Sequence, residues 1–60
     1  MQSTNVREIN EAIDLQTFRG TRTVQAPDGS RVIRARKVKG QLQAKLLGGT
    51  WINVETISIN

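Results

Sequence analysis

The stretch VQAPDGSRVIRARKVKGQLQAKLL, residues 24–47, contains two turn signals set among residues that favour extended structure. In Pro27-Asp28-Gly29, proline fixes φ for a type I turn and glycine accepts the left-handed position, which predicts a three-residue hairpin loop. Lys39-Gly40 predicts a two-residue turn. The sequence therefore predicts three consecutive antiparallel strands, over about residues 21–26, 30–38 and 41–47.

These turns decide which side chains share a face of the predicted sheet, because side chains alternate along a strand. They pair Val24 with Val32, Ala35 with Ala44, and Ile33 with Leu46. One face is then apolar and contains Ile33, Ala35, Leu42, Ala44 and Leu46. The opposite, outer face contains the basic residues Arg22, Arg34, Arg36 and Lys45. Four apolar residues also fall on the outer face: Val24, Val32, Val38 and Leu47.

A fourth strand is predicted after the glycines at positions 48 and 49. A two-residue Gly48-Gly49 loop would turn the polar residues that follow toward the apolar face. A three-residue loop over 48–50 instead places Ile52 opposite Leu46 and Val54 opposite Ala44. Because one face must be buried, and a one-residue slip exchanges the faces, the three-residue loop is favoured. It points Trp51 outward.

The alternation of apolar and polar residues changes phase after Val54. Ile52 and Val54 have even numbers, whereas Ile57 and Ile59 have odd numbers. A kink at Glu55-Thr56 would let residues 57–60 cross to another side of the sheet, as the last strand of a small SH3-like barrel does. The alternatives are that residues 57–60 form a loose tail or pair with another subunit.

An N-terminal helix is predicted over about residues 5–18. Asn5 is a good N-cap with Glu8 three residues later, and Gly20 is a natural stop. Val6, Ile9 and Ile13 follow at helical spacing. Residues 1–4 are expected to fray. The predicted fold class is therefore α+β: one N-terminal helix packed on a four-stranded antiparallel β-meander over residues 21–60, which can curl into a small SH3-like barrel.

The chain has 60 residues, which allow one small domain, 1–60, with a core of marginal size. The predicted core consists of Val6, Ile9, Ile13, Phe18, Ile33, Ala35, Leu42, Ala44, Leu46, Ile52 and Val54. Cysteine and histidine are both absent, so disulfides and the common zinc sites are excluded. No metal or cofactor is expected, and we expect a homo-oligomer or a chain stabilised by a partner.

Charge is distributed unevenly along the chain. Residues 1–18 carry one arginine and three acids, a net of −2, and residues 19–60 carry eight basic residues and two acids, a net of +6. This asymmetry indicates a directed basic surface. No segment approaches the roughly 18 apolar residues of a membrane span, and the first residues lack the features of a signal peptide. We therefore expect a cytoplasmic protein, or one delivered by something other than ordinary secretion.

The sequence contains no set of residues typical of an enzyme active site, so the function is predicted from the basic face. Without histidine or cysteine, and with scattered acids, no enzyme activity is expected. Arginines around an exposed aromatic side chain resemble nucleic-acid platforms. The predicted DNA- or RNA-binding residues are Arg22, Arg34, Arg36, Lys37, Lys39, Lys45 and Trp51. Arg and Trp are also enriched at protein interfaces, so the alternative is a protein-binding module that contacts an acidic protein surface.

One local resemblance concerns about ten residues. A helix ending at glycine, then Thr23-Val24-Gln25, a turn with Asp28-Gly29, and Arg31-Val32 is similar to the hairpin of the small head-to-tail joining proteins W of lambda-like phages. The second helix of that family is replaced here by strands containing Gly48-Gly49. The small size and basic charge resemble phage accessory proteins as a group. That group includes virion joining proteins, DNA binders and inhibitors of host proteins, and it implies a location in the host cytoplasm.

Overall fold

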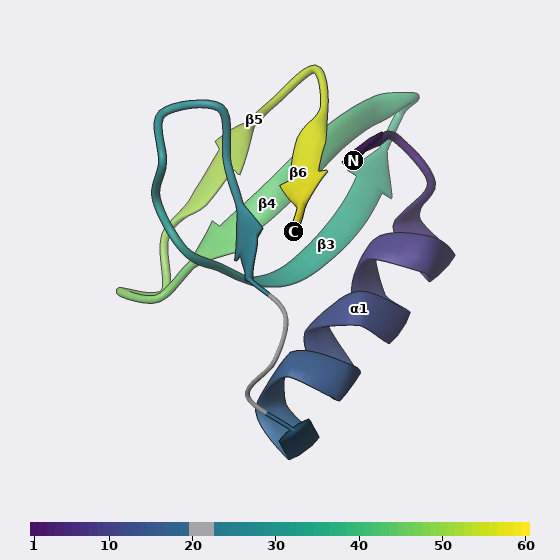
Figure 1. Ribbon diagram of the computed structural model, residues 1–60. Helices are drawn as coiled ribbons and strands as arrows, with labels where there is room; N and C mark the ends of the chain where they lie inside the picture. Colours follow the sequence, from purple (N-terminus) through teal and green to yellow (C-terminus); the bar gives the residue numbers. More distant parts are fainter. Residues whose placement is uncertain (20–22) are drawn as a thin grey trace.

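The fold combines one helix with two small antiparallel sheets, in a computed structural model that describes residues 1–19 and 23–60, the side chains of residues 17–19 excepted (Figure 1). The elements in chain order are β1 (Gln2–Ser3), α1 (Val6–Arg19), β2 (Val24–Gln25), β3 (Val32–Val38), β4 (Gln41–Leu46), β5 (Trp51–Asn53) and β6 (Ile57–Ile59). One sheet has the order β1-β6-β2 and the other β3-β4-β5. The α+β class is confirmed, with the strands divided between two sheets instead of forming one four-stranded meander.

Helix α1 begins at the predicted cap. The Asn5 side chain accepts a hydrogen bond through Oδ1 from the backbone N–H of Glu8 at 3.0 Å. The side chains of Ile9, Ala12 and Ile13 form the buried stripe of the helix. Two further predictions, Gly20 as the helix stop and Phe18 as a core side chain, lie outside the described residues.

Two amide side chains of α1 hydrogen-bond to the backbone of an edge strand, one in each sheet. Asn10 donates from Nδ2 to the Ala35 carbonyl at 3.0 Å and accepts from the Ala35 N–H through Oδ1 at 2.9 Å. The buried Gln16 side chain accepts from the Val24 N–H through Oε1 at 2.8 Å. Figure 1 shows α1 lying alongside β3. The helix therefore supplies the partners that a further strand would otherwise provide.

The two three-residue hairpin loops, 27–29 and 47–49, have the same geometry. In each, the residue before the loop donates its N–H to the carbonyl of the residue after it, at 2.8 Å and 2.9 Å respectively. Gly29 and Gly49 hold the last loop position with φ of 91° and 94°, which glycine adopts without a Cβ clash. The second loop therefore starts one residue earlier than the predicted 48–50.

This shift moves the register of β5 by two residues and leaves its faces as predicted. Ile52 lies opposite Ala44 rather than Leu46, and Trp51 lies opposite Lys45. A slip of two residues preserves the alternation, whereas a slip of one would exchange the faces.

A β-bulge in β3 changes the faces at the start of that strand. Arg34 lies opposite Lys45 as predicted, but the next pair is Val32 with Leu46, so the predicted pairing of Ile33 with Leu46 is wrong. Val32 is fully buried, whereas Ile33 is only partly buried. Val24 is fully buried as well. The predicted exposure of both valines is wrong, because the bulge and the break between the sheets turn them into the core.

After β5 the chain leaves the β3-β4-β5 sheet at a bend at Glu55, and it enters the β1-β6-β2 sheet as strand β6. The phase change in the sequence predicted this crossing. The β6 residues Ile57 and Ile59 are buried and extend the predicted core. Of the predicted strand over 21–26, β2 covers Val24–Gln25 and pairs with β6. A bridge from Gln25 to Arg31 links β2 to the segment just before β3.

Residues 1–4 were expected to fray, but Gln2–Ser3 form β1 at the edge of the β1-β6-β2 sheet. Gln2 lies opposite Ser58, and Ser3 lies opposite Ile57 and is buried. The terminal amine of Met1 donates to the Ile59 carbonyl at 2.8 Å. The buried strand β6 needs a hydrogen-bonding partner on this edge, and β1 supplies it.

Replacing Asn10 with alanine should lower the free energy of unfolding by about 1–3 kcal/mol, because the N–H and C=O of Ala35 lose their partner. Urea unfolding followed by circular dichroism measures this loss. The matched control is Glu11→Ala on the same helix, which removes an exposed ion pair with Arg7 at 3.3 Å and should cost less than about 1 kcal/mol. Equal losses in the two variants would contradict the role assigned to Asn10.

Candidate nucleic-acid interface

The outer face of the β3-β4-β5 sheet is the surface opposite the core. The observed register places eight side chains on it: Arg34, Arg36, Val38, Gln41, Gln43, Lys45, Trp51 and Asn53. Three of them are basic and none is acidic. The face is therefore a positively charged surface with amide groups and one indole ring.

A hydrogen-bonded row of side chains crosses all three strands of the outer face. Arg36 donates from Nε to Gln43 Oε1 at 2.8 Å, and Gln43 donates from Nε2 to Asn53 Oδ1 at 2.8 Å. Arginine has only donors, so Gln43 must present its oxygen to Arg36 and its NH₂ group to Asn53. The row therefore ends with the Asn53 NH₂ group at the edge strand β5, a donor available to an acceptor on a ligand.

The Arg36 guanidinium also stacks on Trp51. Its Cζ atom lies 3.9 Å from the centroid of the Trp51 ring, which is half-buried. This cation–π contact and the bond to Gln43 hold the guanidinium in one orientation. The Nη groups of Arg36 make no hydrogen bond within the described part of the chain, so they face outward as a fork of donors.

Arg34 and Lys45 lie directly opposite each other on neighbouring strands. Like charges in this position destabilise a sheet by up to roughly 1 kcal/mol unless water or a ligand screens them. Among residues 1–19 and 23–60 the ion pair is Arg7–Glu11 on α1, and no carboxylate is paired with the outer face. The basic residues of the face therefore carry uncompensated charge.

The structure brings together only part of the predicted site. Arg34, Arg36, Lys45 and Trp51 share the outer face. Lys37 lies opposite Leu42, on the other side of β3, and is exposed. Lys39 occupies the β3–β4 turn with φ of 50°. Arg22 lies outside the described residues. Gln43 and Asn53 join the site, and their position on the same alternating face is the sequence signal for them.

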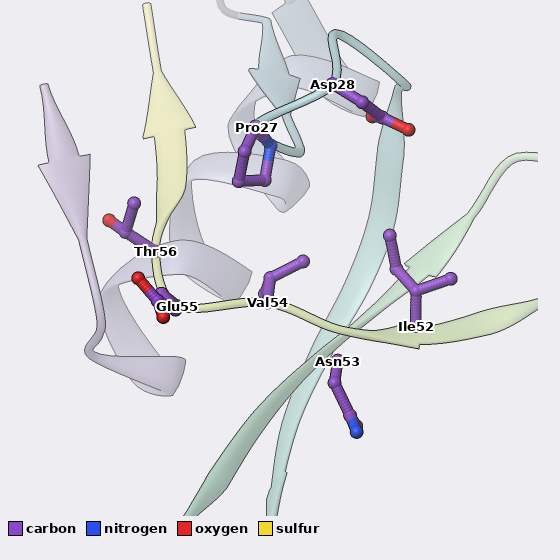
Figure 2. Close-up of a pocket in the computed structure, with 7 residues that line it drawn as sticks. All are labelled: Pro27, Asp28, Ile52, Asn53, Val54, Glu55 and Thr56. Carbon is purple, nitrogen blue, oxygen red and sulfur yellow. The ribbon is translucent and has the colours of Figure 1, made fainter.

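A cavity of about 420 Å³ lies on the inner side of β5, against the 27–29 loop. Figure 2 shows Ile52 and Val54 pointing toward this loop, and Asn53 pointing to the opposite side of the strand. Asp28 and Glu55 also line the cavity. Its acidic groups and its apolar lining make it chemically distinct from the outer face.

Asp28 fixes the 27–29 loop through a local hydrogen bond. The backbone N–H of Ser30 donates to Asp28 Oδ1 at 2.9 Å, and this bond lowers the pKa of Asp28 below its ordinary value of 3.8.

No helix in the part of the chain that the structure describes is long and apolar enough to cross a membrane.

The stabilisation from Asp28 should depend on pH. Because its folded pKa lies below 3.8, the stabilisation is fully present above that pH and is lost as pH falls through the folded pKa. The difference in unfolding free energy between wild type and Asp28→Ala should therefore shrink in acid. Urea unfolding of both proteins across acid pH measures it, and a difference that grows on acidification would contradict this assignment.

Comparisons with protein-family models, curated proteins and solved structures found no match to this chain.

Proposed function

We propose that this chain is a small non-enzymatic protein that binds nucleic acid through the outer face of the β3-β4-β5 sheet. The observation that carries the proposal is the grouping of Arg34, Arg36 and Lys45 on one face, without a carboxylate partner among the described residues. A polyanion with regularly spaced phosphates is the ligand that relieves this repulsion over the whole face.

Arg36 is the best-positioned contact of the face. Its Nε is held by Gln43 and its plane is stacked on Trp51, so little rotational freedom is lost when the Nη fork meets a phosphate. The stack also covers one side of the indole ring. An unpaired base therefore stacks on the guanidinium plane above Trp51, a mode typical of single-stranded RNA and DNA recognition.

The burial of Val24 and Val32 favours nucleic acid over a protein partner. With these two side chains in the core, the outer face loses two of the four apolar residues predicted on it, and with them apolar area that a protein interface needs at its centre. The remaining charged and amide groups suit a phosphate backbone better than an apolar contact.

A protein-binding module is the second candidate, as in a phage joining protein or an inhibitor of a host protein. It is supported by two exposed apolar residues: Val38, at the end of β3 opposite Gln41, and Leu47, which follows β4 and has 67% of its surface accessible. Leu47→Ser would then abolish partner binding and leave oligonucleotide binding unchanged. For either candidate we propose action in the cytoplasm, in the host if the chain is phage-encoded.

Arg34→Ala and Arg36→Ala should each weaken binding to a single-stranded oligonucleotide and reduce the slope of log affinity against log salt by about 0.7–1. Fluorescence anisotropy of a labelled oligonucleotide at several salt concentrations measures both effects.

The matched control is Arg7→Ala, which removes the same charge from α1, where Arg7 is paired with Glu11. This variant should bind with the wild-type slope. The proposal fails if Arg7→Ala and Arg34→Ala are equally impaired, or if the folded wild-type protein binds no oligonucleotide at low salt.

A further inference from the structure

Strand β5 has an open hydrogen-bonding edge. The Thr50 carbonyl and the Val54 N–H bond to β4, at 2.9 Å and 3.0 Å. Because an antiparallel ladder alternates, the N–H and C=O groups of Trp51 and Asn53 point away from β4. No described residue bonds to them. The opposite edge of the sheet, on β3, is closed at Ala35 by Asn10.

The composition of β5 does not protect this edge. Soluble proteins usually place lysine, proline or an inward-pointing charge on an exposed edge strand, to prevent another strand from pairing with it. Trp51, Ile52 and Asn53 include none of these. Beside the edge, the cavity lined by Pro27, Ile52 and Val54 leaves apolar surface open next to the strand (Figure 2).

We propose that a second copy of this chain pairs its β5 with this edge, antiparallel, around a two-fold axis at Ile52. In this register Ile52 faces Ile52 of the second copy as a non-hydrogen-bonded pair, whose side chains approach most closely. The outward N–H of Trp51 in each copy then donates to the Asn53 carbonyl of the other copy. The outward N–H of Asn53 donates to the Trp51 carbonyl in the same way. The two Ile52 side chains meet on the inner side, at the mouths of the two cavities.

The charge near β5 favours the antiparallel direction. Glu55 is the charged residue nearest to the strand in the sequence that follows it. With Ile52 on the two-fold axis, Glu55 falls opposite Gly49 of the second copy, so the two Glu55 side chains lie at opposite ends of the paired strands. The strand itself is neutral. A parallel pairing would instead place the two Glu55 side chains side by side, which is destabilising.

The paired strands join two three-stranded sheets into one continuous sheet. The two outer faces then lie on the same side, with Arg34, Arg36 and Lys45 contributed by each copy. This association is independent of the proposed nucleic-acid binding, and it is measured without any oligonucleotide.

The test compares wild type, Asn53→Pro and Asn53→Ala by sedimentation equilibrium over a range of concentrations. Proline removes the outward N–H of residue 53 and leaves the β4–β5 bonds intact, so this variant should be monomeric. Alanine keeps that N–H, so this control should dimerise like wild type. Wild type that remains monomeric at millimolar concentration, or an Asn53→Pro variant that dimerises like Asn53→Ala, would overturn the proposal.

Hydrogen exchange on the wild-type protein gives a readout that does not depend on how a variant folds. The amides of Trp51 and Asn53 should exchange more slowly as protein concentration rises, because pairing protects them. The Gln25 and Ile52 amides should show no such change. Exchange at Trp51 and Asn53 that is fast and independent of concentration would contradict pairing at this edge.

Discussion

The fold depends on the hydrogen bonds that α1 makes to the backbone of one edge strand in each sheet, β3 and β2. Asn10 satisfies both polar groups of Ala35, and Gln16 satisfies the N–H of Val24. A chain this small has little apolar surface to bury, so the position of the helix cannot rest on hydrophobic contact alone. Unsatisfied backbone groups would cost more than a shifted apolar contact. The amides therefore fix where Ile9 and Ile13 enter the core, and they close one edge of each sheet at the same time.

The bulge in β3 links this packing to the chemistry of the surface. By turning Val32 into the core while Arg34 and Arg36 stay outside, it separates apolar from basic side chains along one strand. The outer face that results is polar, positively charged and partly pre-organised by the contacts of Arg36 with Gln43 and Trp51. The same strand thus presents its backbone to the helix and its arginines to solvent.

The sequence was informative wherever neighbouring residues decide the structure. Asn5 marked the start of the helix, and the loop glycines marked both three-residue turns. The faces of β5 were predicted correctly despite the wrong register, because the error was an even number of residues. The bulge at Val32 to Arg34 left no local signal, since an extra residue shows only against its partner strand. The pairing of β1 with β6 joins the two ends of the chain, so no local pattern predicts it. Asn10 and Gln16 resemble solvent-facing helix residues until the strands are placed.

For the site, alternation located Arg34, Arg36 and Lys45, whereas the row from Arg36 through Gln43 to Asn53 required the register of three strands.

The claim that the outer face binds nucleic acid is tested most directly by nuclear magnetic resonance during titration with a single-stranded oligonucleotide. The largest shifts should occur at the Arg36 Nε–H, the Trp51 indole N–H and the side-chain amides of Gln43 and Asn53. The backbone amides of α1 should not move. Shifts centred on α1, or on the cavity between the 27–29 loop and Ile52, would contradict the account.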